Sequence, residues 1–351
     1  MFKKILSSVL FLAIAGTSAI FAQSRVALHH EGQVTIFGGA APFADAYNAA
    51  VSGDTIYLPG GSFAAPAAIA KGIAIYGAGH YPDSTAVTLP TSVTGSVLIS
   101  EGADNLRFEG ILFTGEFTFI YNQKVDNVVI SRCRINGNLT YNGTIAPCEN
   151  HQISQCVIIG TVYFNNLQGS TITNCIIQGQ IQNGNSLVIS NNVVMFDGTY
   201  TPCQGCNECN GSYYNIKNST VINNVHLRRA SAVSTACIQR DCAGSTFSNN
   251  LIVAASPNFG DNTVSGNYLN VVANDMCVNA PDNVFDYTKD YHLQDPETYL
   301  GTDGTQVGIY GGALGYKPGA VPSNPHFSSA TVAPTTNEEG KLNVNIKVIA
   351  Q

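Results

Sequence analysis

The sequence predicts an all-β solenoid, a fold in which short strands stack in register along one axis. Three observations support this prediction. A short phrase recurs eight times along the chain, apolar residues hold two fixed columns of that phrase, and helical periodicity is absent from the copies. A unit of this length cannot bury its own apolar side chains. It must therefore stack on its neighbours.

The columns of the repeat define its strands. Copies begin at Asn105, Asn127, Asn150, Gly169, Ser186, Asn218, Gly244 and Asp261, with spacings of 17 to 32 residues. The fourth position is apolar in all eight copies, and the ninth is apolar in seven, with His226 as the exception. β-branched residues dominate both columns, which favours strands on either side of a short turn.

The seventh position of the repeat predicts two ladders of aligned side chains. After Ile111 in the first copy, it holds three cysteines and then four asparagines: Cys133, Cys156, Cys175, Asn192, Asn224, Asn250 and Asn267. Stacked amides can hydrogen-bond from rung to rung, and thiols serve as small apolar fillers. We expect these cysteines to stay reduced, because parallel stacking aims their Cβ atoms poorly for a disulfide.

Apolar columns beside a turn of stacked asparagines resemble the right-handed parallel β-helix of pectin-lyase-like proteins. The stretch "GDTIYLPGGSF" followed by "GIAIYGAGHYPDST" is similar to the opening coils of that family, and "DYHLQDPETYLGTDGTQVGIYGG" resembles the closing coil of many exported bacterial members. The resemblance implies a single-stranded right-handed parallel β-helix over residues 23–315. It implies no single activity, since this scaffold hosts lyases, hydrolases, adhesins and inert surface proteins.

The chain begins with a pattern typical of a secretory signal peptide. Lys3 and Lys4 precede an apolar run from Ile5 to Gly16, and small residues follow as far as Ala22. We expect residues 1–22 to be removed by cleavage after Ala22, and the protein to be secreted, held at the cell surface or periplasmic. The apolar run is too short to be a membrane span, and we expect no span elsewhere.

Segments at both ends of the repeats predict a short N-terminal cap and a C-terminal strand tail. Residues 43–53 have alanine-rich helical spacing, so a short helix would shield the first strands. Residues 317–340 are rich in proline and serine, which predicts a linker or an extended strap. The stretch "KLNVNIKV" alternates apolar and polar residues, which predicts a half-buried strand paired with an edge of the solenoid. Residues 316–351 would form this linker and strand.

Charge and composition narrow the functional classes. The chain carries 16 Lys and Arg against 23 Asp and Glu, a net charge of −7, and only 11% of its residues are charged. The negative sign argues against a nucleic-acid partner. Few charges leave few candidate acids and bases, which favours a non-catalytic role. We expect a monomer without cofactor or metal.

Two insertions between copies are rich in cysteine. The first contains "PCQGCNECNGSYY" and the second "TACIQRDCAG", and both fall between the same columns of successive copies. We therefore expect the two loops to lie side by side, joined by disulfides as is usual in exported proteins. The candidates are Cys203, Cys206, Cys209, Cys237 and Cys242, whose pairing the sequence leaves open. The alternative is a zinc site with thiolate ligands.

The same loops gather the candidate functional residues. The catalytic candidates are Lys217, His226, Arg228, Arg229, Arg240 and Asp241, and the binding candidates are Glu208, Tyr213 and Tyr214. A polysaccharide lyase needs a cation for the uronate carboxylate and a base for the C5 proton, and these residue types supply both. The alternative is structural: Arg228 and Arg229 would solubilise a strand face, Arg240 would pair with Asp241, and His226 would be buried and neutral.

Three hypotheses follow from these patterns. The first is an exported, non-catalytic surface protein that is adhesive, structural or in contact with polysaccharide or cell-surface glycan. The second is a polysaccharide lyase or glycoside hydrolase that acts from the cysteine-rich loop face. The third is a thiolate metal-binding module. We favour the first, because the charge is low and the aspartate clusters that the related lyases and polygalacturonases use are missing from the repeats.

Overall fold

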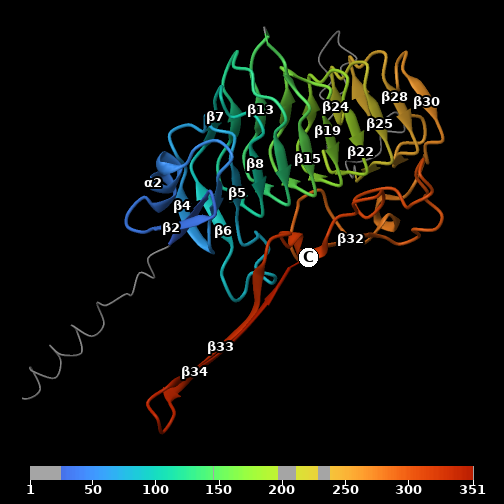
Figure 1. The fold of residues 1–351 in the computed structure, drawn as a ribbon. Helices are drawn as coiled ribbons and strands as arrows, with labels where there is room; N and C mark the ends of the chain where they lie inside the picture. The colour runs from blue at the N-terminus through green and yellow to red at the C-terminus, as the bar shows by residue number, and fades with distance from the viewer. Residues whose placement is uncertain (1–24, 145, 197–210, 228–237, 351) are drawn as a thin grey trace, which may run out of the picture.

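The computed structural model describes residues 25–144, 146–196, 211–227 and 238–350. Within these ranges the chain forms three long sheets of short, mostly parallel strands, together with a short α-helix and small two-stranded sheets (Figure 1). The predicted all-β architecture of repeated parallel strands is confirmed, and it is consistent with a β-helix.

Sheet 1 has twelve strands and follows the fourth column of the repeat. Its β1 pairs antiparallel with β2 and β3, and every later neighbour pairs in parallel. In spatial order the strands are β2 (Gln33–Phe37), β1 (Val26–His30), β3 (Thr55–Tyr57), β5 (Ala74–Tyr76), β8 (Arg107–Glu109), β11 (Val129–Ser131), β15 (Gln152–Ser154), β19 (Thr171–Thr173), β22 (Val188–Ser190), β25 (Thr220–Ile222), β28 (Thr246–Ser248) and β30 (Thr263–Ser265).

Sheets 2 and 3 receive the next two strands of each repeat. Sheet 2 contains β4 (Gly61–Ala64), β6 (Thr91–Thr94), β9 (Leu112–Phe113), β12 (Arg134–Ile135), β16 (Val157–Ile158), β20 (Ile176–Ile177), β23 (Val193–Val194), β26 (Val225–His226) and β29 (Leu251–Ile252). Sheet 3 contains β7 (Val97–Ile99), β10 (Phe117–Phe119), β13 (Leu139–Tyr141), β17 (Val162–Phe164), β21 (Ile181–Gln182), β24 (Tyr213–Tyr214) and β27 (Gln239–Arg240). A short pair, β14 (Cys148–Glu149) and β18 (Leu167–Gln168), lies between sheets 3 and 1 in chain order.

Left-handed turn residues separate sheet 1 from sheet 2. The sixth position of every copy has a positive φ: Gly110, Arg132, Gln155, Asn174, Asn191, Asn223, Asn249 and Gly266. Asparagine adopts this conformation more readily than most side chains, and glycine does so without steric cost. The turn redirects the chain from sheet 1 to sheet 2 within two residues, so the fourth and ninth columns both line the interior in every copy except the last.

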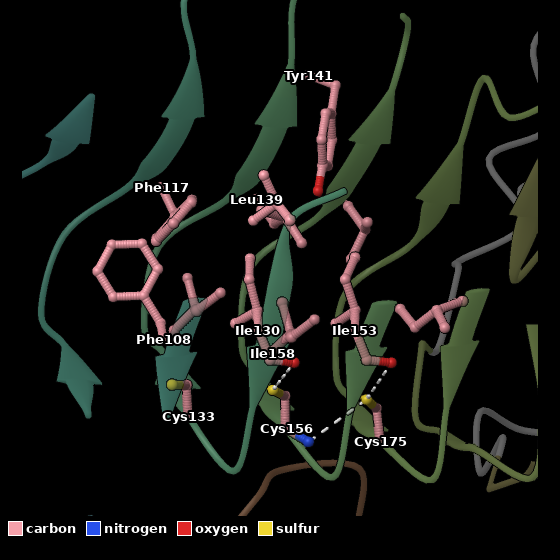
Figure 2. Close-up of a cluster of buried hydrophobic side chains, with 14 of the residues drawn as sticks. Phe108, Phe117, Ile130, Cys133, Leu139, Tyr141, Ile153, Cys156, Ile158 and Cys175 are labelled. Carbon is pink, nitrogen blue, oxygen red and sulfur yellow. Dashed lines mark hydrogen bonds between the residues drawn. The ribbon is translucent and has the colours of Figure 1, made fainter. Parts of the chain in front are cut away.

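The core between the three sheets is apolar and rich in rings. Phe108, Phe113 and Phe117 meet edge to face, with ring centroids 5.1 to 5.4 Å apart. Figure 2 shows Ile130 and Ile153 beside the row of Cys133, Cys156 and Cys175. Burial at this density makes stacking of successive rungs the main source of stability.

The N-terminal end carries the expected short helix. Helix α2 (Pro42–Ala49) begins with proline, which suits the first turn of a helix, and buries Phe43, Ala46 and Tyr47. The helix contacts β1, β2 and β4. Its apolar side chains therefore cover the first strands of the stack.

The segment that follows β30 returns along the outside of sheet 2. It contains η1 (Ala273–Asp275), β31 (Cys277–Asn279), β32 (Asp290–Leu293) and η2 (Pro318–Ala320). Its apolar side chains form a second core with the outward residues of the sheet 2 strands, among them Val157, Ile176 and Val225. We call residues 299–323 of this segment the strap.

The segment that follows β30 corrects the expectation of a closing coil. Residues 290–312 add no strand to the three long sheets of the described chain, and β32 pairs antiparallel with β31 alone. The physical reason lies in the two-residue strands of sheet 2. Both residues of pairs such as Ile176–Ile177 are buried, so the outer face needs a cover that another coil would not provide.

The C-terminal strand also differs from its prediction. Strand β34 (Leu342–Ile349) pairs antiparallel with β33 (His326–Thr336) and not with an edge of the solenoid. The two strands form a hairpin that extends away from the body (Figure 1). The proline and serine content of residues 317–340 predicts a linker. In the structure, residues 326–336 form β33 instead, and its apolar residues lie opposite those of β34.

Candidate functional site

The outer face of sheet 3 presents one side chain from each rung. Because successive residues of a strand point to opposite faces, the residue next to an inward Phe or Ile in the same strand points outward. The aligned outward residues are Leu98, Thr118, Thr140, Tyr163, Gln182, Tyr214 and Arg240. We call this row the sheet 3 file. Its members are spaced by one rung, about 4.8 Å, and nearly all are neutral.

The end of the file holds a cation above an aromatic ring. The guanidinium carbon of Arg240 lies 5.2 Å from the centroid of Tyr214. Arg240 Nε also lies 3.5 Å from the Asp241 carboxylate, which is the ion pair that the structural alternative predicts. Both side chains remain partly exposed, so the pair contributes little to stability.

Tyr213 and His226 lie in the core, which corrects their assignment to a surface site. Both are almost fully buried, and Tyr213 Oη lies 3.5 Å from His226 Nε2. Burial lowers the pKa of His226 to about 3, so its imidazole is neutral. Neither side chain is exposed on the outer face of sheet 3, whereas that of Tyr214, which follows Tyr213 in the chain, is partly exposed there.

Lys217 is exposed but lies apart from the ends of the insertions. Its backbone bridges Asn185 and Ala243 on the neighbouring rungs, between sheet 3 and sheet 1. The insertions instead enter between sheet 2 and sheet 3. The structure therefore does not place the Lys217 backbone between sheet 2 and sheet 3, where the insertions enter.

The insertions themselves lie outside the described residues. Glu208, Arg228, Arg229, Cys203, Cys206, Cys209 and Cys237 all fall there. Their described flanks are neighbours, because β23 pairs with β26 and β24 pairs with β27. The predicted adjacency of the loops and their remaining disulfide pairings stay predictions.

Cys242 is a free thiol in the structure, unlike its assignment to a disulfide. Its side chain is buried, and its sulfur accepts a hydrogen bond from the Ile216 amide at 3.3 Å. Burial raises the pKa of the thiol to about 11, which disfavours the reactive thiolate. Among the described residues, no group of three or more His, Cys, Asp or Glu side chains could hold a metal ion.

The seventh column forms a continuous internal ladder. Asn192, Asn224 and Asn250 each donate a side-chain hydrogen bond to the amide oxygen of the next asparagine, at 2.9 to 3.0 Å. The cysteines extend this column toward the N-terminus, and the Cys156 amide donates to Cys175 Sγ at 3.4 Å (Figure 2). This column lies inside the body and is structural.

Sequence reasoning missed Tyr163, Gln182 and the buried Glu109. The first two could have been found by counting from the ninth column to the next strand, whose residues alternate. Glu109 accepts hydrogen bonds from Arg107 at 3.0 Å, Arg132 at 3.3 Å and the Ser323 amide at 2.6 Å. Burial alone would raise its pKa, but these donors outweigh burial and lower it. No local sequence signal links Glu109 to Ser323, because the strap brings them together.

No protein-family model, curated protein or solved structure matches the chain. Among the described residues, no helix has both the length and the hydropathy that crossing a bilayer requires.

Proposed function

We propose that this protein is an exported, non-catalytic, single-stranded right-handed parallel β-helix of the pectin-lyase-like type that contacts polysaccharide or cell-surface glycan. The contact surface is the sheet 3 file. The observation that carries the proposal is the register of this file, which lines up hydroxyl, amide and aromatic groups along a flat face.

The chemistry of the file suits a neutral, extended glycan. Thr118, Thr140 and Gln182 offer hydrogen-bonding groups, and Tyr163 and Tyr214 offer rings with a polar end. The two tyrosines are two rungs apart, about 10 Å, a distance comparable with the length of two sugar units. A linear glycan lying along the stack could therefore meet both rings in succession.

The fold proposal rests on the order of the strands and on the internal ladder. Each complete repeat supplies sheets 1, 2 and 3 in turn, and the asparagine column follows the turn between sheets 1 and 2. This arrangement supports the resemblance to pectin-lyase-like proteins. The non-catalytic role is supported by the burial of His226, which takes the histidine candidate out of reach of substrate.

Glycan binding tests the proposal directly. We expect the secreted chain to bind members of a glycan panel, and Tyr163→Ala and Tyr214→Ala each to weaken that binding about tenfold, as loss of a stacked ring predicts. Tyr121→Ala is the matched control, because Tyr121 is an exposed tyrosine outside the file. A wild-type chain that binds no glycan, or equal losses in all three variants, would show that the file is not the contact surface.

A lyase is the second candidate because Arg240 lies over the Tyr214 ring. That contact puts a cation beside a phenol, the two groups that proton abstraction next to a uronate needs. Unsaturated products from a panel of uronate polysaccharides, lost in Arg240→Ala, would establish this activity and exclude the non-catalytic proposal. The thiolate metal hypothesis depends on cysteines outside the described residues, and a thiol count with zinc analysis decides it.

A further inference from the structure

We propose that two copies of this protein associate through their C-terminal hairpins. In this arrangement the apolar faces of β33 and β34 pack against the same faces of the second copy, and the hairpins run in opposite directions. The inference goes beyond the glycan contact and replaces the expectation of a monomer.

One face of the hairpin is apolar over most of its length, up to the pair of Thr336 and Leu342 near the tip. Residues directly opposite each other in an antiparallel pair lie on the same face. Phe327 lies opposite Val348, Ala330 opposite Ile346, and Val332 opposite Val344. The large members are between 44% and 56% exposed: Phe327, Val332, Leu342, Val344, Ile346 and Val348.

The opposite face of the hairpin is polar. It carries Ser329 and Thr331 from β33, and Asn345 and Lys347 from β34, in the alternate register. The hairpin thus has the pattern of a sheet with one buried side. An isolated two-stranded hairpin is marginally stable, and its open edges invite pairing. The apolar face therefore needs a partner.

A groove at the base of the hairpin continues this apolar face. It has a volume of about 500 Å³ and lies between Phe327 and Ile346 on the hairpin and Tyr57, Tyr76 and Val87 on the body. Arg25 also lines it, and the described residues that line the groove include no carboxylate. The groove therefore fits an occupant that is extended, largely apolar and negatively charged at its end.

The tip of the hairpin matches the charge of the groove. The turn between β33 and β34 carries the exposed Glu338 and Glu339, the latter paired with Lys341 at 2.8 Å. In an antiparallel pair the tip of each hairpin reaches the base of the other. Both tips would then bring their glutamates to Arg25 of the second copy, which makes the contact self-complementary under twofold symmetry.

The buried area is compatible with such a pair. Strand β34 has eight residues, so the hairpin face measures about 27 Å by about 10 Å, or roughly 270 Å². Two faces bury roughly 540 Å², which alone is too small for a stable interface. Insertion of both tips into both grooves adds to this area, toward the roughly 1,000 Å² that a specific interface needs.

The groove does not suit a sugar. Tyr57 and Tyr76 stack on each other with centroids 5.5 Å apart, so each covers one face of the other. His29 covers the far side of Tyr57 at 4.8 Å, and the Arg107 guanidinium lies over Tyr76 at 5.9 Å. These contacts leave ring edges and no free ring face for a pyranose to stack on. An apolar strand therefore fits better.

Light scattering of the secreted chain tests the apolar face. We expect the wild type to have twice the mass of one chain at micromolar concentration, and Val344→Ser with Ile346→Ser to have the mass of one chain. Thr331→Ser with Asn345→Ser changes the polar face of the same hairpin and should keep the doubled mass. Far-UV circular dichroism and thermal melting check that all variants retain the solenoid, whose two cores exclude these residues.

A charge exchange tests the antiparallel arrangement. Arg25→Glu alone, and Glu338→Lys with Glu339→Lys alone, should each weaken self-association at least tenfold. An equimolar mixture of the two variants should associate with the wild-type affinity, because every groove then meets a tip of opposite charge. A wild type that is monomeric at all concentrations, a doubled mass in the apolar-face variant, or a mixture that stays monomeric would each overturn the proposal.

Discussion

One position of the repeat changes its chemistry halfway along the molecule, from a thiol to an amide. The Cys156 amide donates to Cys175 Sγ at 3.4 Å, whereas the Cys175 amide donates to Asn192 Oδ1 at 2.9 Å. In both cases the side chain accepts a hydrogen bond from the backbone amide of the same column one rung earlier. That amide would otherwise be buried without a partner. Both side chains also donate to the carbonyl of the fourth position one copy earlier, Asn192 Nδ2 to Ile172 at 3.0 Å and Cys175 Sγ to Ile153 at 3.8 Å. Asparagine adds a further bond, because Asn192 Nδ2 donates to Asn224 Oδ1 at 3.0 Å. An amide therefore ties neighbouring rungs with more and shorter hydrogen bonds than a thiol does.

We predict that Asn224→Ala lowers the free energy of unfolding by about 2–6 kcal/mol, since each of two buried groups left without a partner costs about 1–3 kcal/mol. The Asn192 amide and the Ile189 carbonyl would both lose their bonds to Asn224. Asn224→Cys should lose less, because sulfur still accepts the backbone bond. Chemical denaturation measures these values.

Asn165→Ala is the control for the ladder. Asn165 is exposed and accepts a single bond from Asn183 at 2.6 Å. Its loss should cost less than about 0.5 kcal/mol, as for most surface substitutions. Equal effects at Asn165 and Asn224 would contradict the stabilising role of the internal ladder.

At the scale of elements, the sixth column holds the strap. Asn249 Nδ2 donates to the Leu300 carbonyl at 3.1 Å, Asn174 Nδ2 to the Gly311 carbonyl at 2.8 Å, and Arg132 Nη1 to the Val321 carbonyl at 3.0 Å. The strap therefore runs along the stack from the C-terminal rungs toward the N-terminal rungs. These side chains satisfy carbonyls of a segment that has no strand neighbours of its own.

We predict that Asn174→Gly loosens the strap without disturbing the rungs. Asn174 has a φ of 52°, which glycine adopts without strain. The variant removes the side-chain bonds to Ile309 and Gly311 in the strap, and one bond from the neighbouring Thr173 hydroxyl. Hydrogen exchange in residues 299–323 should accelerate about tenfold, while the sheets keep their protection. Acceleration across all three sheets, or none in the strap, would contradict this role.

The sequence was sufficient for elements built on local periodicity and insufficient for those built on distant contacts. The fourth and ninth columns predict the strands on both sides of the turn, because both columns are buried in every copy except the last. The strap could not be predicted in the same way. Residues 290–312 carry apolar residues that fit either a further coil of the stack or a segment that covers the outer face of sheet 2. Which of the two forms depends on the distant strands of sheet 2. The hairpin could not be recognised from the sequence, because bulges near Phe327 and Val332 interrupt the alternation of apolar and polar residues along β33.

At the scale of the whole molecule, three histidines are buried in different regions of the fold. Burial, with the charge of Arg134 as a smaller contribution, lowers the pKa of His80 to about 3. Burial lowers the pKa of His151 to about 4, against the opposing hydrogen bond of its ring to the Val125 carbonyl, and lowers that of His226 to about 3. All three are neutral in the folded chain at pH 7.

We predict that stability falls as the pH falls below about 6.5. The unfolded chain binds protons on these histidines near pH 6.5, whereas the folded chain does not until about pH 4 or 3. The stability they contribute is complete above pH 6.5 and decreases by about 1.4 kcal/mol per pH unit for each histidine below it. Urea unfolding at pH 7 and pH 5 measures the slope.

His226→Ile provides the matched test of this slope. Isoleucine is common in the same column, so the variant keeps the packing and removes one titrating group, although Tyr213 loses its ring contact. Its slope should be smaller than that of the wild type by about 1.4 kcal/mol per pH unit. An unchanged slope would show that His226 does not bind a proton on unfolding.

The candidate site was predictable only in part. Arg240 and Asp241 pair as residue chemistry suggests, and Tyr214 points outward on sheet 3. Tyr213 and His226 face inward because the strand alternates, and the insertion obscured the register that would have placed them. Tyr163 has no distinguishing neighbours along the chain. It belongs to the file only because Thr140 and Gln182 lie beside it on adjacent rungs.

The path of the strap has a consequence for how the molecule comes apart. Stacked repeats ordinarily fray from their ends, because each unit touches only its neighbours. Here a single segment is bonded to Asn249 near the C-terminal end of the stack and to Glu109 on β8, the fifth of the twelve strands of sheet 1. The rungs between these two contacts cannot separate until that segment leaves. Unfolding should therefore occur as one cooperative transition with a high kinetic barrier, and a protease should find few partly opened forms to cut.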